Sequence, residues 1–248
     1  MKRVKLLIEY DGTSYVGWQI QKNGKSIQGE IELCLMNIFN EKLNLHVAGR
    51  TDAGVHALKQ VAHFDIEKLR INENNIYKAI NFFLKKKKNK ITILDSKIVN
   101  NRFHSRFSVR KKYYLYKILN RQTKSFIEEN KVWFIPQKIN INKMQKAANL
   151  LLGKHDFNAF RSIDCQSKTS IRTIDEIKIK KKSDFINIRI SAKSFMHNQV
   201  RIIVGTLIDV GKEILVEESI KNIIKSKDRK NAGQTAPASG LYLEKIVY

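Results

Sequence analysis

Residues 48–56, Ala-Gly-Arg-Thr-Asp-Ala-Gly-Val-His, contain the densest group of side chains able to do chemistry. Gly49 and Gly54 bracket this segment, and glycine lets a backbone adopt positive φ and approach another molecule closely. Arg50 and Asp52 are two positions apart, so on an extended loop their side chains point to the same side. A carboxylate held beside a cation stays ionised at neutral pH and can act as a nucleophile or a base.

Two other interpretations apply to this segment. The G-x-x-x-x-G spacing is typical of a phosphate-binding loop, but Val55-His56 stands where that motif requires Lys-Ser/Thr, so this interpretation is excluded. A tight turn in which Asp52 bonds its own backbone also fits the spacing. Spacing alone slightly favours this structural interpretation.

The remaining histidines and acids give weaker signals. None of the six histidines has the HxxxH, HExxH or Cys/His spacing of a metal site, so we expect no metal and no other cofactor. Asp11, Asp52 and Asp65 would form the metal-binding cluster of a nuclease only if three distant segments converged.

Several basic and aromatic residues have two readings. Arg102, His104 and Arg106 alternate, so an extended segment would place them on one face, and RNA contact and structural pairing fit equally well. Trp18 and Trp133 favour a core or groove-wall position over a base-stacking one.

The net charge of +24 predicts attraction to polyanions and salt-dependent binding of nucleic acid. However, only 12 of the 47 basic residues are arginines. An excess of lysine in a chain rich in Asn and Ile is also typical of genome-wide base composition. The charge therefore favours a nucleic-acid partner without establishing one.

Targeting signals and thiols bear on the compartment. No apolar run is long enough to cross a bilayer, and the apolar residues 6–8 are closed by Glu9 and Asp11, so we expect neither membrane insertion nor export. Cys34 and Cys165 are isolated thiols that suit a reducing cytosol. We therefore expect a cytoplasmic protein.

Hydrophobic periodicity predicts strands and helices in irregular alternation. The expected strands are residues 4–10, 43–47, 60–64, 91–99, 113–118, 171–179, 185–190 and 241–247. Residues 181–184, Lys-Lys-Ser-Asp, are expected to join 171–179 to 185–190 as a hairpin. The expected helices are 27–38, capped by Ser26, and 72–83, 141–152, 200–210 and 216–224. Because no regular βαβ rhythm appears, the expected fold class is α+β, with a mixed, mainly antiparallel sheet flanked by helices. We expect two lobes around a basic central cleft. Residues 1–100 form the N-terminal lobe, which carries the Asp52 loop, and residues 101–248 form the C-terminal lobe.

Residues 49–56 resemble the signature loop of the bacterial tRNA pseudouridine synthase A family. The resemblance extends in the family's order over residues 9–12, 17–19, 103–108, 114–116, 152–157, 195–205, 227–229 and 236–243. It implies the pseudouridine synthase fold and an isomerase that converts uridine to pseudouridine at positions 38–40, in the anticodon stem-loop of tRNA. It also implies a homodimer that uses no nucleotide cofactor.

The resemblance assigns roles to charged residues. Asp52 matches the family's catalytic aspartate, and Arg201 the arginine that pairs with it. Arg50 resembles the loop arginine that occupies the space left by the extruded base. Extruding a base costs a few kcal/mol of stacking and pairing.

It also assigns residues to the target base. Tyr114 matches the active-site tyrosine that packs on the base, Tyr116 is the next tyrosine of that strand, and Leu241 matches a leucine of the base pocket. Tyr113 departs from the family's usual basic or small residue, which leaves open which tyrosine matters. Stacking on an aromatic ring returns about 1–3 kcal/mol per base.

A protein of another class shares these features. A non-catalytic RNA-binding protein or tRNA folding helper would have the same charge and the same fold. Only Asp52 distinguishes it from the isomerase.

Overall fold

The computed structural model describes residues 1–248, which divide into two units. The first unit comprises Met1–Arg110 and Tyr242–Tyr248, and the second comprises Lys111–Leu241. The last residues of the chain thus belong to the same unit as the first hundred. They add a strand to the first unit's group of strands.

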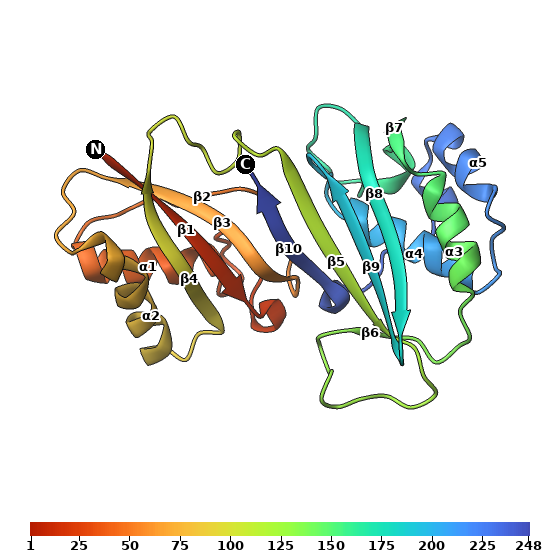
Figure 1. Ribbon diagram of the computed structural model, residues 1–248, viewed down its shortest axis with the longest axis horizontal. Coiled ribbons are helices and arrows are strands. Elements are labelled where there is room, and N and C mark those ends of the chain that lie inside the picture. The colour runs from red at the N-terminus through yellow and green to blue at the C-terminus, as the bar shows by residue number, and fades with distance from the viewer. The chain divides into compact units, whose positions relative to one another are not determined.

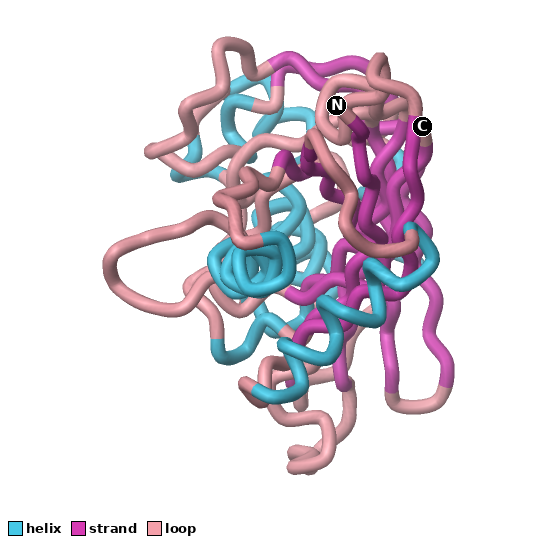
Figure 2. The backbone as a smooth tube through the Cα atoms, turned by 90° about the vertical axis from the view of Figure 1, so that its left-hand side faces the viewer, coloured by secondary structure: helices cyan, strands magenta, loops and turns pink.

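The strands of the first unit run in the order β4 (Ile91–Val99), β1 (Lys2–Tyr10), β3 (His56–Ile66) and β10 (Leu241–Val247). β1 pairs antiparallel with β4 and β3, the short β2 (His46–Val47) pairs antiparallel with β3, and β10 is parallel to β3. β1 is therefore flanked by β4 and β3, and the first and last residues of the chain lie near the same end of these strands (Figure 2).

Helices α1 (Ile27–Phe39) and α2 (Ile76–Lys86) pack against each other beside these strands, and α2 also packs on β4 (Figure 1). As expected, Ser26 caps α1, because its side chain accepts a hydrogen bond from the Gly29 N–H. Residues of α1 at every third or fourth position are buried, and so are alternate residues of β1. These two faces make the core of the first unit.

The strands of the second unit run in the order β5 (Lys111–Leu119), β9 (Phe185–Ala192), β8 (Ile171–Lys182) and β7 (Gly153–Asp156). These pairs are antiparallel, and only the two-residue β6 (Trp133–Phe134) is parallel to β5. A two-residue turn with Ser183 at φ 53° joins β8 to β9, which confirms the expected hairpin.

Helix α4 (Gln199–Gly211) is the centre of the second unit's core, since all but two of its residues are buried. Helix α3 (Ile141–Asn149) packs on α4 and on β8, and α5 (Ser219–Ser226) follows them in the chain (Figure 1). Single 3-10 turns lie at Gly12–Ser14, Glu73–Asn75, Asn158–Phe160, Arg229–Asn231 and Ala238–Gly240.

The expected α+β class and mainly antiparallel pairing are confirmed. The strand expected at 43–47 shortens to β2, and Asn72 caps a 3-10 turn that leads into α2. β6 and β7 were not expected, because both are too short to show a periodic pattern. None of the helices combines the length and apolar character needed to span a bilayer.

Gly205→Ala should destabilise the protein. Gly205 lies in α4 against the Gln234 backbone, and a β-carbon there would overlap the Gln234 carbonyl oxygen. Overpacking of this kind costs about 1–3 kcal/mol, more than the gain in helix propensity. Thermal unfolding followed by circular dichroism should show a lower Tm. The exposed substitution Asn222→Ala on α5 is the control and should change stability by less than about 0.5 kcal/mol. An unchanged Tm for Gly205→Ala would contradict the close packing.

Candidate active site

The loop that follows β2 presents Arg50 and Asp52 outward. Arg50 is exposed, Thr51 is buried and Asp52 is half-buried, so the side chains alternate as the extended-loop expectation required. The backbone turns directly afterwards, where the Val55 N–H donates to the Asp52 carbonyl at 3.2 Å. The loop thus holds the carboxylate partly out of water without enclosing it.

Buried hydrogen bonds fix this loop from below. The Tyr10 hydroxyl and Thr51 Oγ1 share a hydrogen bond of 2.7 Å. The backbone N–H of Trp18 donates to the Thr51 carbonyl at 3.0 Å. Gln60 Nε2 donates to the Gly49 carbonyl at 2.8 Å. Burial raises the pKa of Tyr10 to about 12, so its hydroxyl keeps its proton. The residues directly before Asp52 are therefore tied to β1, to β3 and to Trp18.

Two glycines let the N-terminal segments approach the loop. A β-carbon on Gly12 would overlap the Val55 carbonyl oxygen, and one on Gly17 would lie 2.7 Å from the Thr51 carbonyl oxygen. Gly17 also has φ 107°, a conformation that other residues rarely adopt. The spacing of residues 9–12 and 17–19 therefore has a physical reason, because these segments support the Asp52 loop.

His56 joins the end of the loop to the segment after β1. The Gly12 N–H donates to His56 Nδ1 at 3.1 Å, and the His56 ring stacks on Tyr242 at 4.6 Å. Burial works to raise the pKa of Asp11, but hydrogen bonds from Thr13 and the charges of His56 and Lys90 lower it overall. Asp11 is therefore an ionised partner within the fold.

In the second unit, Arg201 is held at the first turn of α4. Its Nε donates to the Ala236 carbonyl at 2.6 Å and its Nη1 donates to Asn198 Oδ1 at 2.8 Å. The Ala236 N–H in turn donates to the Arg201 carbonyl at 3.2 Å. The guanidinium is thus oriented by neutral acceptors in this unit.

Tyr116 secures the same segment. Its hydroxyl donates to the Pro237 carbonyl at 2.7 Å, and a β-carbon on Gly240 would lie 2.6 Å from its ring. Burial raises the pKa of Tyr116 far above its usual range, with a smaller opposing effect from Arg201. Tyr116 is fully buried and positions residues 236–241, so its role in this structure is to support the segment that ends in the buried Leu241.

Tyr114 lies two residues before Tyr116 on β5 and therefore on the same face of that strand. Its ring packs edge to face against Phe195 at 5.3 Å. Tyr114 is buried and Phe195 is half-buried, whereas Tyr113 points to the other face. The structure thereby separates the two adjacent tyrosines that the sequence left open.

Sequence reasoning missed three supporting residues. Tyr10 and Gln60 hold the Asp52 loop, and Phe195 orients Tyr114. Tyr10 and Phe195 lie inside segments that carry the family resemblance, which was the available signal. Gln60 lies in a strand of ordinary appearance, and nothing in the sequence marks it.

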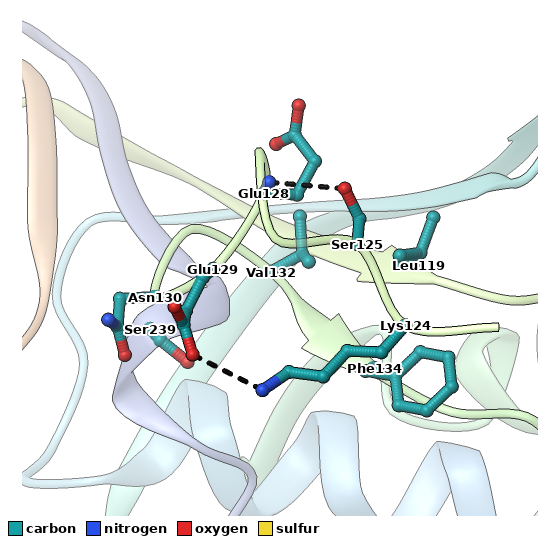
Figure 3. A pocket seen from close by; sticks show the side chains of 9 residues that line it. All are labelled: Leu119, Lys124, Ser125, Glu128, Glu129, Asn130, Val132, Phe134 and Ser239. Atoms are coloured by element: carbon teal, nitrogen blue, oxygen red, sulfur yellow. Dashed lines mark hydrogen bonds and ion pairs between the residues drawn. The ribbon is translucent and has the colours of Figure 1, made fainter.

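Two hollows of the surface lie away from these residues. A hollow of about 170 Å³ in the second unit is lined by Lys124, Glu129, Phe134 and neighbours, with a Lys124–Glu129 ion pair of 3.2 Å across it (Figure 3). A larger one of about 570 Å³ is lined by residues 138–142 and 211–213. Neither contains a residue proposed for chemistry.

Asp65, one of the three aspartates that a metal-binding nuclease cluster would need, has another partner. Asp65 forms a two-pronged ion pair with Arg3 at 2.6 and 2.7 Å. No group of three or more His, Cys, Asp or Glu side chains is arranged to hold a metal ion.

Comparison with known proteins agrees with the resemblance. A family model described as tRNA pseudouridine synthase matches residues 6–108 and 147–248. The chain is 48% identical over 247 residues to "tRNA pseudouridine synthase A" of Wolbachia pipientis wMel, covering 99% of this chain and all of the relative. Proteins of the same name from Anaplasma phagocytophilum and Ehrlichia chaffeensis are 44% and 47% identical, again over 99% of this chain and their whole length. This chain therefore belongs to the tRNA pseudouridine synthase family.

Proposed function

We propose that this chain converts uridine to pseudouridine in the anticodon stem-loop of tRNA, at positions 38–40, with Asp52 as the nucleophile. Its membership of the family makes it an isomerase. The observation that carries the proposal is the Asp52 loop, in which one half-buried carboxylate stands on a backbone fixed by buried hydrogen bonds. A pre-organised charge of this kind needs little rearrangement before reaction.

The reaction balances without any co-reactant. The bond between the ribose C1′ and uracil N1 breaks, the ring turns, and a bond forms between C1′ and C5. The proton on C5 leaves, and N1 takes up a proton. Because the same base is reattached, neither a redox agent nor a water nucleophile is consumed, and a single carboxylate suffices where hydrolytic glycosidases generally use two.

The other assigned residues act on the charge and on the base. We assign to Arg201 the positive charge that keeps the catalytic carboxylate ionised, a role suited to its fixed guanidinium. Arg50 is exposed beside Asp52, and its planar side chain would fill the stack vacated by the flipped uridine.

Tyr114 would pack on the target base, since its ring is already oriented by Phe195. Leu241 would line the same pocket, and Tyr116 would hold Leu241's segment in place. We further propose that the chain works in the cytoplasm as a homodimer and that tRNA contacts both copies.

Asp52→Asn should abolish catalysis and spare binding. The amide keeps the size of the side chain but loses its charge and nucleophilicity, so turnover should fall by at least about a thousandfold. Release of tritium from C5 of labelled uridine in unmodified tRNA measures turnover, and filter binding measures affinity. Turnover near the wild-type rate would contradict the role of Asp52. Wild-type protein that binds tRNA but releases no tritium would favour the non-catalytic RNA-binding protein.

Tyr114→Phe should lower kcat about tenfold or more while leaving KM within about threefold. The substitution keeps the ring that packs on the base and removes only the hydroxyl. Loss of one hydrogen bond in the transition state lowers a rate by about this factor. Tyr113→Phe is the matched control, because that side chain occupies the other face of β5. If steady-state kinetics show Tyr113 to be the sensitive residue, the assignment is displaced by one position.

The affinity for tRNA should fall steeply with salt. Lysines and arginines that contact phosphates displace condensed counterions, so contact with about six phosphates lowers affinity about a thousandfold between 50 and 200 mM salt. Filter binding across this range gives the slope. A flat response would show that the charge of +24 does not serve RNA binding.

A further inference from the structure

The turn that follows β4 exposes a phenylalanine side chain to solvent. Phe107 is 74% exposed, as several other large apolar side chains of this protein are, so its exposure gains meaning only from its neighbours. It lies in residues 100–109 of the first unit, the segment whose alternating basic residues had two readings in the sequence.

The turn is rigid, so the ring is not exposed by disorder. The Ser108 N–H donates to the His104 carbonyl and the His104 N–H donates to Ser108 Oγ, each at 2.9 Å. Ser105 is fully buried, and its carbonyl accepts from the Tyr248 hydroxyl at 2.8 Å. The turn is therefore attached to the core of the first unit.

Further bonds join the start of this turn to β1. Arg3 Nη1 donates to the carbonyls of Asn101 and Phe103, at 2.7 and 2.6 Å. Since Arg3 is itself held by Asp65, this end of the turn has little freedom to move. The exposed ring is thus presented in a fixed place.

His104 supports one side of the exposed ring. Its imidazole contacts the Phe107 ring in a tilted arrangement, with 4.4 Å between ring centres and 36° between planes. His104 Nδ1 accepts from the N–H groups of Arg106 and Phe107, which locks the imidazole in place. Burial, together with the charges of His46, Arg3 and Arg106, lowers the pKa of His104, which favours the neutral ring that these two bonds require.

The segment that carries the ring is basic. Arg106 lies over Phe107 with its guanidinium carbon 5.6 Å from the ring centre. Within the first unit, residues 100–110 contain three arginines and no acid, and Arg102 and Arg110 are exposed like Arg106. An exposed aromatic ring within a cationic surface is the combination that binds a base and its phosphates together.

We propose that Phe107 is a stacking platform for an unpaired base of the RNA substrate, with His104 as its support and Arg106 as the neighbouring cation. The proposal rests on the proposed function in one respect, that RNA is the ligand. The charge favours RNA over a protein partner, because a chain with a net charge of +24 attracts a polyanion. Base stacking also tolerates any sequence, because every base has a π face.

The test compares Phe107→Ala, Phe107→Leu and Phe107→Trp by tRNA affinity, kcat at saturating tRNA, and oligomeric state from light scattering. Phe107→Ala should weaken binding about 5- to 150-fold, equivalent to about 1–3 kcal/mol, with kcat unchanged. Leucine should behave as alanine because it has no π face, and tryptophan should bind at least as tightly as wild type. The salt slope should stay unchanged, since no phosphate contact is removed.

Phe126→Ala is the matched control. Phe126 is 82% exposed in the second unit, but its loop also carries Glu128 and Glu129, so it should contribute nothing to RNA affinity. Wild-type affinity for Phe107→Ala, or for Phe107→Leu, would overturn stacking. A change of oligomeric state in Phe107→Ala would instead mean that a protein surface covers the ring. If the wild-type protein binds tRNA but shows no turnover, the proposed function is wrong. The stacking proposal is still tested in that case, because it depends only on the tRNA affinities of the Phe107 variants.

Discussion

The buried contact between Tyr10 and Thr51 is the constraint on which the candidate site depends. Thr51 is fixed through its side chain by Tyr10 and through its carbonyl by Trp18, so its neighbours Arg50 and Asp52 must both turn outward. A hydrogen bond inside a protein is costly to leave unmade, because a buried donor or acceptor then loses water without compensation. The position of the carboxylate is thus secured by the stability of the fold beneath it.

The second unit uses the same principle with different groups. Arg201 and Tyr116 both bond carbonyls of residues 236–237, and Gly205 lets α4 approach that segment. A single extended segment therefore couples the guanidinium at the start of α4 to the strand that carries Tyr114. Bonds to the neutral oxygens of Ala236 and Asn198 orient this cation without cancelling its charge.

The turn at Phe107 extends this arrangement from chemistry to recognition. Catalytic groups act on one nucleotide, but an RNA must first be oriented, and rigid aromatic rings do so with little loss of side-chain entropy. Arg3 of β1 and the C-terminal residue Tyr248 both hydrogen-bond to the turn. The ring and the Asp52 loop therefore belong to one packed unit. Recognition and catalysis then rely on the same core.

Local chemistry alone determined much of this protein. The Ser26 cap, the turn at Ser183 and the alternation of Arg50 and Asp52 depend on residues close in sequence, and each was predicted from its pattern. The loop's family resemblance likewise needed only adjacent letters. What only the tertiary structure decided are contacts across long stretches of chain. Tyr10 meets Thr51, Gln60 meets the Gly49 carbonyl, and β10 returns beside β3. Such contacts depend on which surfaces bury each other, and no local pattern records that choice.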